Sequence, residues 1–334
     1  MWQSVVCAAQ GRGHSKNNLP CQDKVIAQHE NGVHVIALAD GAGSAKLSHF
    51  GAQCVVATTA QFLTDHFAEC FTCTDGREVK RQLLETIRAA LEQEASKHNC
   101  ELRDLASTLL TVAVSDEHFI LAHLGDGVVG YLDGSELKVA SSPDNGEFSN
   151  ETTFVTSQSA LAALRLFKGE LKNKCGFVLM SDGSEQSLYH KQSKSLSPAL
   201  KTLMHLTCIS APEAMYQRVS TAISEILCAQ TNDDCSLAIL ATDSASLPPL
   251  NELETKLRRD LLVIKDDPKA KRRLERMDTI LEYAREPRTL KEISLAIQLK
   301  PKHTQKRIDK LMQLGFLVQQ GERYQTYQAP QNEA

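Results

Sequence analysis

Several apolar, strand-like runs of this sequence begin or end at an aspartate. The run Val33–Ala39 leads directly into Asp40, and a carboxylate at the end of so apolar a strand is costly unless a cation meets it. The other aspartates in such positions are Asp23, Asp126, Asp182, Asp233 and Asp234. Residues that end one strand and begin its antiparallel neighbour lie at the same edge of a sheet. We therefore expect these acidic side chains to gather at one end of the core.

Carboxylates in one crevice repel one another and require cations. The strand-end set consists of aspartates, and oxygen-only sites favour Mg²⁺ or Mn²⁺ over zinc. The alternative interpretation, favoured for Asp126 taken alone, is that each Asp-Gly pair is a solvated turn. Several such pairs at strand ends are better explained by a metal site.

The cysteines offer a second, weaker candidate for a metal site. Cys70 and Cys73 form a CxxC pair with His66 nearby. Because no second CxxC follows at matching spacing, zinc is disfavoured. We expect the ten cysteines to be reduced, as is typical of a cytoplasmic protein.

The predicted elements follow an order that suits antiparallel sheets. The strand-like runs are Trp2–Ala8, Val33–Ala39, Leu109–Val114, Phe119–Leu124, Val128–Leu132, Phe177–Met180 and Ser236–Ala241, and the helical runs are Phe50–Phe67, Val79–Lys97 and Pro212–Ala229. Two consecutive helices followed by a strand meander do not fit the alternation of a parallel sheet. We expect an α+β domain whose antiparallel sheets are covered by helix pairs.

Five short motifs fall in the order and spacing of the metal-dependent protein phosphatase 2C family. They are QD at 22–23, DG at 40–41, GDG at 125–127, SDG at 181–183 and DDCS at 233–236. The sequence resembles this family over about residues 3–241, and LPCQD, ADGAGSA and GEFSNETTFVT look like a compact bacterial branch of it. The resemblance implies an αββα four-layer sandwich of two antiparallel sheets flanked by helix pairs.

The resemblance also implies a role for each motif in the hydrolysis of phosphoserine and phosphothreonine in proteins. Two ions, Mn²⁺ or Mg²⁺, would activate a water for attack on phosphorus, and a third, more labile ion would bind beside them. The implied metal ligands are Asp40, the Gly41 carbonyl, Asp126, Asp182 and Asp233; Asp40, Asp182 and Asp233 are also the implied catalytic residues, and Gln22 and Asp23 form an outer shell. Asp234 is interpreted as a flanking residue.

The sequence departs from the family pattern at two positions. Asn18 stands where many members carry a phosphate-binding arginine, so Arg12, His14 or Lys16 is expected to replace it; a solvated loop is the alternative for all three. Ala42 stands where some members carry a His that serves as general acid, so the acid is unassigned. The segment 146–154 is interpreted either as a cover beside the site or as an ordinary surface loop.

A second, basic unit is expected after the phosphatase-like region. We divide the chain into a catalytic domain (1–243), a linker with a charged helical segment (244–270) and a small winged helix-turn-helix (271–330). From Pro268 onward the chain carries a net charge of +6, against −10 for the rest. Helices are expected at Met277–Arg285, at Leu290–Ile297 with Thr289 as N-cap, and from Pro301 to Leu314, followed by a hairpin. Lys302, Lys306 and Arg323 are candidates for binding DNA or a protein partner.

Two functions are therefore compared. The first, which we favour, is a cytoplasmic protein serine/threonine phosphatase that acts on a phosphorylated protein, is paired with a cognate kinase and is recruited by its tail. The second is a catalytically weak, phosphatase-like sensor that controls a DNA-binding winged helix. The intact set of aspartates favours the enzyme, because carboxylates that no cation meets cost stability. No apolar run is long enough to cross a membrane, so no membrane partner is expected.

Overall fold

The computed structural model describes residues 1–143, 152–244 and 250–328. The chain divides into two compact units. One contains residues 4–204 and 219–241, and the other contains residues 1–3, 205–218 and the chain from 242 onward. Among the described residues, no helix combines the length and the apolar character that crossing a membrane requires.

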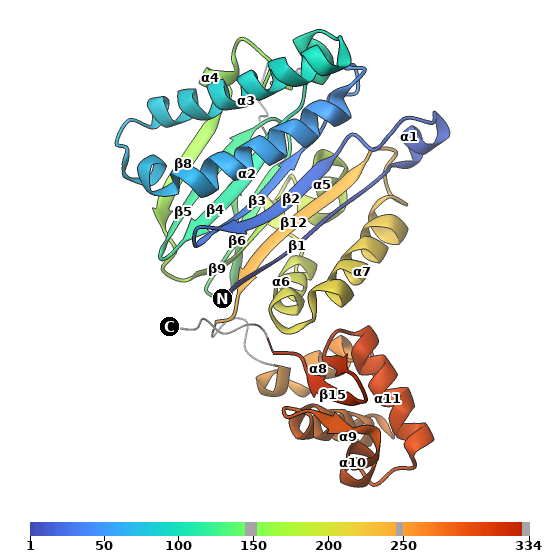
Figure 1. Cartoon of the computed structure of the whole chain (residues 1–334). Coiled ribbons are helices and arrows are strands. Elements are labelled where there is room, and N and C mark those ends of the chain that lie inside the picture. Colours follow the sequence, from blue (N-terminus) through green and yellow to red (C-terminus); the bar gives the residue numbers. More distant parts are fainter. Residues whose placement is uncertain (144–151, 245–249, 329–334) are drawn as a thin grey trace. The chain divides into compact units, whose positions relative to one another are not determined.

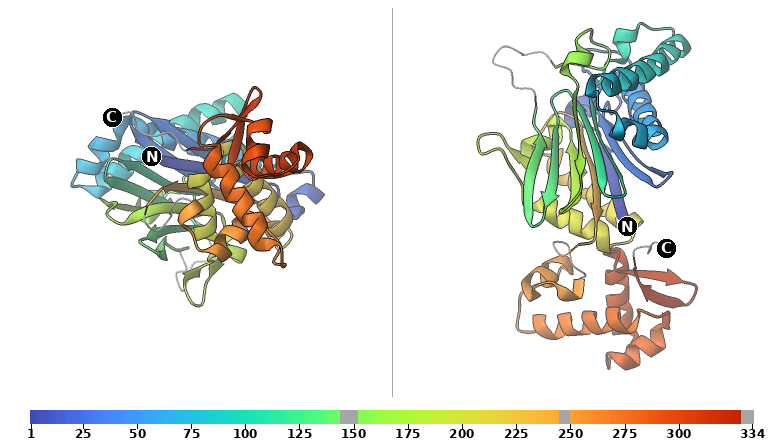
Figure 2. Two further views of the ribbon diagram at one scale, coloured as in Figure 1. Left: turned by 90° about the horizontal axis from the view of Figure 1, so that it is seen from below. Right: turned by 90° about the vertical axis from the view of Figure 1, so that its left-hand side faces the viewer.

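The larger unit is built around two five-stranded sheets (Figures 1 and 2). The first has the order β2 (Lys24–Glu30), β3 (Val33–Ala39), β4 (Leu109–Ser115), β5 (His118–Leu124) and β8 (Arg165–Glu170), and its pairs are antiparallel. The second has the order β1 (Trp2–Ala9), β12 (Cys235–Thr242), β9 (Lys174–Met180), β6 (Val128–Asp133) and β7 (Glu136–Ser141). Strands β3 and β4 of the first sheet face β9 of the second.

Two long helices cover the outer face of the first sheet (Figure 1). They are α2 (Ser48–Thr72) and α3 (Gly76–His98). The expected apolar stripe of α3 is present, since Leu83, Ile87 and Leu91 are each 1% exposed. The sheets and this helix pair confirm the predicted combination of antiparallel sheets and helices.

The elements that sequence patterns missed are short or only partly buried. Strands β7 and β8 alternate weakly, because most of their side chains are half-buried. Helix α5 (Asp182–Leu188) follows an Asp-Gly pair that reads as a turn, and α6 (Ala199–Ile209) was also missed. Helix α7 is shorter than expected, because Pro212–Ala222 is α-helical and Ile223–Leu227 forms a π-helical turn.

The smaller unit contains helices and a three-stranded sheet at its C-terminal side. Its elements are α8 (Thr255–Leu261), α9 (Ala270–Tyr283), α10 (Leu290–Ala296) and α11 (Pro301–Gln313), with strands β13 (Arg288–Thr289), β14 (Leu317–Gln320) and β15 (Arg323–Thr326). The expected start of the first helix at Met277 was wrong. The helix begins at Ala270, because Leu274 continues the buried row of Met277 and Ile280 one turn earlier.

Residues 205–218 pack within this smaller unit against the end of α11. The Ala211 N–H donates to the carbonyl of Gly315 at 2.8 Å, and Arg218 Nη2 donates to the carbonyl of Leu314 at 3.3 Å. Gly315 has φ +80°, and a Cβ there would lie 2.7 Å from Cβ of Ala214. This position therefore requires glycine for its backbone conformation and for the close approach.

The expected capping box of α10 is present and gives a test of tail stability. Thr289 accepts a hydrogen bond from the Glu292 N–H, and the Glu292 carboxylate accepts one from the Thr289 N–H. Thr289→Ala should lower the free energy of unfolding of this unit by about 1 kcal/mol, measured by denaturant titration. Thr279→Ala is the control, because Thr279 is exposed on α9 and its hydroxyl bonds only to the Glu275 carbonyl; equal losses for the two variants would contradict the capping role.

Candidate active site

Asp40 is held at the end of β3 by backbone contacts to Thr108. The Asp40 N–H donates to Thr108 Oγ1 at 2.9 Å, and the Asp40 carbonyl accepts from the Thr108 N–H at 2.8 Å. The next residue, Gly41, forms an isolated bridge with Ser107. The apolar strand therefore ends in a segment whose backbone is held at Asp40.

The same edge of the molecule receives aspartates from other strands. Asp126 follows β5 after Gly125, whose φ of +116° turns the chain. Asp182 follows β9 and starts α5, and Asp233 lies just before β12. Because β9 and β12 are antiparallel, with Met180 opposite Leu237, the end of one strand meets the start of the other. The structure thus brings Asp182 and Asp233 together as the strand pattern predicts.

These carboxyl groups raise one another's pKa. Burial raises the pKa of Asp40 well above its ordinary value, and the charges of Asp23, Asp182 and Asp233 raise it further. The pKa of Asp182 rises from 3.8 to about 7 through burial and through the charges of Asp233, Asp126 and Asp23. The ionised forms of Asp40 and Asp182 are therefore destabilised without a cation, by burial and by the charges of aspartates from neighbouring segments.

Asp23 supplies an observation that points to a missing partner. It is 1% exposed, and burial raises its pKa from 3.8 to about 6. Ser181, Ser236 and Asp40 lie beside it, but neither carboxyl oxygen makes a well-formed hydrogen bond. A buried carboxylate with two unsatisfied oxygens fits a site completed by a metal ion or by metal-bound water.

The donor set fits hard divalent cations, although their ligand geometry is not preformed. Within the described ranges, no three or more His, Cys, Asp or Glu side chains are already grouped as a finished ion site. The side chains that face one another here are carboxylates, which suit Mg²⁺ and Mn²⁺. Cys70 and Cys73, which are free thiols, likewise belong to no such group among the described residues.

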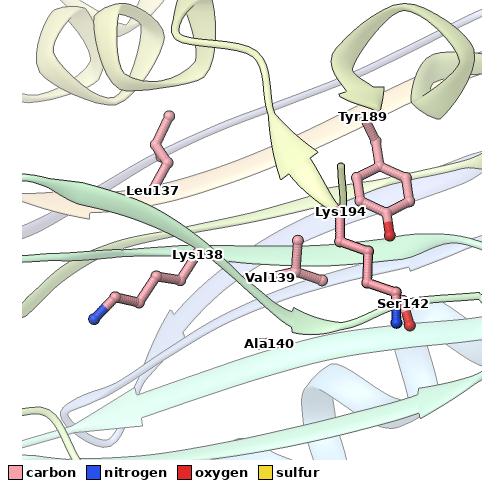
Figure 3. Close-up of a pocket in the computed structure, with 7 residues that line it drawn as sticks. All are labelled: Leu137, Lys138, Val139, Ala140, Ser142, Tyr189 and Lys194. Carbon is pink, nitrogen blue, oxygen red and sulfur yellow. The ribbon is translucent and has the colours of Figure 1, made fainter. Parts of the chain in front are cut away.

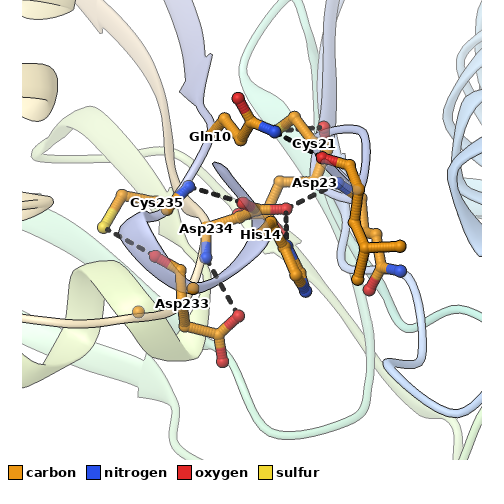
Figure 4. Close-up of polar contacts among 12 residues, drawn as sticks. Gln10, His14, Cys21, Asp23, Asp233, Asp234 and Cys235 are labelled. Atoms are coloured by element: carbon orange, nitrogen blue, oxygen red, sulfur yellow. Dashed lines mark hydrogen bonds and ion pairs between the residues drawn. The ribbon is translucent and has the colours of Figure 1, made fainter. Parts of the chain in front are cut away.

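Asp234, interpreted from the sequence as a flanking residue, is a buried anchor (Figure 4). It is 1% exposed, and its two carboxyl oxygens accept from the Gly11 N–H and the Gln22 N–H, each at 2.6 Å. Nδ1 of His14 lies 2.9 Å from the same carboxylate. Asp234 therefore ties the N-terminal segment that carries Gln22 and Asp23 to the loop that carries Asp233. The sequence signal for this role was the Asp233–Asp234 pair. A strand-end pattern marks both residues alike and cannot show that one of them anchors a neighbouring segment.

Two glycines, Gly11 and Gly183, pack closely against the loop that carries Asp233 and Asp234. A Cβ at Gly11 would lie 2.1 Å from the Asp233 carbonyl oxygen, and a Cβ at Gly183 would lie 2.1 Å from the Asp234 carbonyl oxygen. Real Cβ atoms do not come this close, so any larger residue would displace the loop. The position of Asp233 relative to Asp182 thus depends on both glycines.

The three basic residues expected to bind phosphate lie on or beside α1 (Arg12–Lys16). Nε of Arg12 donates to the Thr231 carbonyl at 3.1 Å, and His14 contacts Asp234. Lys16 is exposed. Arg12 and His14 therefore already have partners that fasten α1 to the segment 231–234.

Two further groups lie near the aspartates: Thr152, a polar residue of the cover that was expected from the sequence to contact substrate, and Glu185, which sequence reasoning missed. Thr152 donates its hydroxyl to Asp126 Oδ2 at 2.7 Å; it belongs to the expected cover 146–154, of which residues 146–151 lie outside the described residues. The buried Glu185 of α5 forms an ion pair of 2.6 Å with Lys191. Neither stands at the end of an apolar run, so no strand pattern marked them.

A pocket of about 410 Å³ lies beside the hairpin that follows α5 (Figure 3). Its walls come from β7 and from the hairpin of β10 (Tyr189–His190) and β11 (Ser195–Leu196). The lining residues are Leu137, Lys138, Val139, Ala140, Ser142, Tyr189 and Lys194. No residue expected from the sequence to act in catalysis lines this pocket.

The raised pKa of Asp182 predicts a pH-dependent effect of Asp182→Asn on the metal-free protein. The folded state holds the proton more tightly than the unfolded state, so wild type loses stability as pH rises from about 4 through about 7. Asp182→Asn should therefore be the more stable protein above pH about 7, with a gap that closes toward pH about 4. Denaturant titrations in EDTA at several pH values measure this difference.

The quantity to compare is the difference in the free energy of unfolding between wild type and Asp182→Asn at each pH. Buried His123 changes the stability of both proteins with pH in the direction opposite to Asp182, and the difference removes its contribution. Its pKa is lowered to about 3 by burial, so stability falls in both proteins as pH drops through about 6.5. Asp133→Asn is the control of opposite sign, since Lys138 lowers the pKa of Asp133. A pH-independent gap for Asp182→Asn would contradict the proposed crowding.

Comparison with known proteins adds independent findings. Residues 10–228 match the sequence model of the family described as Protein phosphatase 2C. "Serine/threonine-protein phosphatase 3" of Escherichia coli (strain K12) is 28% identical over 177 residues, which are 50% of this chain and 67% of that protein. The family match contains Asp23, Asp40, Asp126 and Asp182 and ends before Asp233.

A solved structure of a bacterial serine phosphatase agrees in fold. A bacterial serine phosphatase superposes with a TM-score of 0.51 at 13% identity and covers 73% of this chain and 100% of its own. The catalytic domain of the serine/threonine protein phosphatase PstP, solved in complex with 2 manganese ions, has a TM-score of 0.48 at 17% identity and covers 72% and 99%. The family match spans well over half of the chain and contains four of the five motifs. The chain belongs to the protein phosphatase 2C family and is a protein serine/threonine phosphatase.

Proposed function

We propose that the protein hydrolyses phosphoserine and phosphothreonine in proteins at the aspartate cluster, with Mn²⁺ or Mg²⁺ as cofactor. The observation that carries this proposal is that burial raises the pKa of Asp23, Asp40 and Asp182, and that the charges of neighbouring aspartates add to the rise. Carboxylates that oppose one another's ionisation are matched by divalent cations with oxygen ligands. We propose that the site binds two such ions and a third ion more weakly.

The proposed ligands are the residues that the resemblance to the family implies. Asp40, the Gly41 carbonyl, Asp126, Asp182 and Asp233 would hold the ions, with Gln22 and Asp23 in the outer shell. When bound, the ions would offset the phosphate charge and activate a water for attack on phosphorus. Asp40, Asp182 and Asp233 are the residues on which turnover should depend most.

The chain's own contribution is to fasten the segments that carry these carboxylates before substrate arrives. Thr108 fixes the backbone of Asp40, Thr152 donates to Asp126, and Asp234 anchors Gln22. Such preorganisation lowers the cost of orienting ligands and substrate during the reaction. Arg12, His14 and Lys16 remain candidates for contact with the phosphate, although Arg12 and His14 already bind the segment 231–234.

We extend the proposal to the arrangement of domains and to the partners. The catalytic domain would be residues 1–243, an αββα four-layer sandwich, followed by a linker at 244–270 and a winged helix at 271–330. The substrate would be a phosphorylated protein with a cognate serine/threonine kinase. The ten free cysteines support a reducing, cytoplasmic location.

The first test is hydrolysis of a phosphothreonine peptide by wild type and Asp40→Asn, each with Mn²⁺, with Mg²⁺ and with EDTA. We expect metal-dependent phosphate release by wild type and a loss of at least about 100-fold in Asp40→Asn, because the central carboxylate is removed. Asp65→Asn, an exposed aspartate of α2, is the matched control and should retain full activity. Turnover that is equal in EDTA, or unchanged in Asp40→Asn, would refute the proposed site.

A second candidate function, DNA binding by the tail, is favoured by its exposed cations. Lys302 and Lys306 are exposed on α11, and Arg323 is exposed at the start of β15. Gln305 of α11 contacts the hydroxyl of Tyr324 at 3.4 Å, which fastens the hairpin to this helix. A helix and a hairpin that present cations together are typical of winged helices on DNA.

Duplex binding at several salt concentrations tests this second function. Lys302→Ala with Lys306→Ala should weaken binding to any duplex sequence and lower the slope of log K against log[salt] by about 2. Lys291→Ala on the exposed face of α10 is the control. Absence of duplex binding by wild type at low salt would leave a protein partner as the role of the tail.

A further inference from the structure

Lys191 stands on a hairpin that follows directly from the helix begun by Asp182. Helix α5 ends at Leu188, and β10 starts at Tyr189. Tyr189 pairs with Leu196 and His190 with Ser195, so residues 191–194 form the turn. The turn carries two lysines with different surroundings: Lys194 lines the pocket of Figure 3, whereas Lys191 reaches back to α5.

The partner of Lys191 on α5 is Glu185, and its position links the lysine to the aspartate cluster. Glu185 follows Asp182 by three residues on the same helix, so both side chains lie on one face. The Glu185 side chain is 3% exposed, and its Oε1 lies 2.6 Å from Nζ of Lys191. Its other oxygen, Oε2, is buried without a hydrogen-bond partner. A buried carboxylate on this face fixes where the ammonium group stands.

The ammonium group of Lys191 remains available to a ligand. The Lys191 side chain is 60% exposed, and an ammonium group has three N–H donors. Contact with Glu185 uses one donor and leaves two. The pKa of Lys191 is raised first by Glu185 and then by the charges of Asp182 and Asp126, so the positive charge lies within their field.

We propose that Lys191 binds the phosphoryl group of the substrate at the Asp126–Asp182 side of the active site, and that Glu185 is its positioning residue. This inference rests on the proposed function, because it assigns a further residue to the same site. It supplies a phosphate-binding cation that the chain lacks at Asn18, in addition to the candidates on α1, of which Arg12 and His14 already contact the segment 231–234. Lysine suits the role as a mobile point charge rather than a bidentate fork.

A purely structural ion pair is the competing explanation. Lys191 would then serve only to neutralise buried Glu185, and its removal would leave a buried carboxylate without a counter-charge, which costs stability. The two explanations differ in what a substitution changes. Phosphate binding predicts a weaker affinity for phosphate at unchanged metal affinity, whereas a structural role predicts a lower melting temperature at unchanged phosphate affinity.

The experiment compares wild type, Lys191→Ala, Lys191→Arg, Glu185→Gln and the control Lys194→Ala, all as full-length protein with saturating Mn²⁺. The readouts are KM and kcat for p-nitrophenyl phosphate and a phosphothreonine peptide, the apparent affinity for Mn²⁺, and the calorimetric affinity for inorganic phosphate. Thermal unfolding of each variant accompanies them.

We expect Lys191→Ala to raise KM for both substrates about tenfold and to weaken phosphate binding by a similar factor. Its kcat should change less, and its Mn²⁺ affinity should not change. Lys191→Arg should recover most of the loss, Glu185→Gln should show a smaller increase in KM, and Lys194→Ala should behave as wild type.

The two proposals fail in different ways. If wild type turns over with Mn²⁺ but Lys191→Ala keeps the wild-type KM and phosphate affinity, the inference about Lys191 is overturned while the proposed function stands. If wild type shows no metal-dependent turnover, the proposed function fails. The calorimetric affinity of wild type and Lys191→Ala for phosphate then still decides the inference, since equal values overturn it.

Discussion

The electrostatic repulsion between buried carboxylates is the constraint on which the active site depends. Asp23, Asp40 and Asp182 each have a raised pKa because burial and neighbouring aspartates oppose their ionisation. A fold that keeps such groups together gives up stability in the metal-free state and gains a strong preference for divalent cations. The rest of the structure can be understood as the framework that prevents these groups from moving apart.

That framework uses backbone contacts more than side-chain packing. Thr108 fixes Asp40 from a neighbouring strand, and Asp234 accepts from the backbone N–H groups of Gly11 and Gln22. Gly183 admits the loop of Asp234 from the opposite side. Each contact joins segments that are far apart in the sequence, so the site forms only when both sheets are complete. The two adjacent aspartates therefore have different roles. Asp233 faces the other carboxylates, and Asp234 binds the backbone of the N-terminal segment at Gly11 and Gln22.

The two parts of the chain differ in the sign of their net charge. The net negative region contains the aspartate cluster, while the basic tail presents Lys302 and Lys306 from α11. A negatively charged region that must admit a phosphate requires local cations as well as metal ions. Lys191, held by Glu185 beside the helix of Asp182, is placed to supply one. Glu185 is buried and the Lys191 side chain is exposed. This arrangement is expected of a cation that is positioned by one carboxylate and accessible to a ligand.

The sequence alone determined the strands that end in aspartates, the α2–α3 helix pair, the capping box at Thr289 and the family, because these depend on local periodicity and on short motifs. It did not determine β7, β8 or α5, whose residues are half-buried or follow a turn signal and become ordered through their neighbours. It also could not show that Asp234 is a buried anchor or connect Glu185 with Lys191. Those distinctions depend on which side chain is buried and what it faces, and only the tertiary structure decides that when distant segments meet at one edge of the sheets.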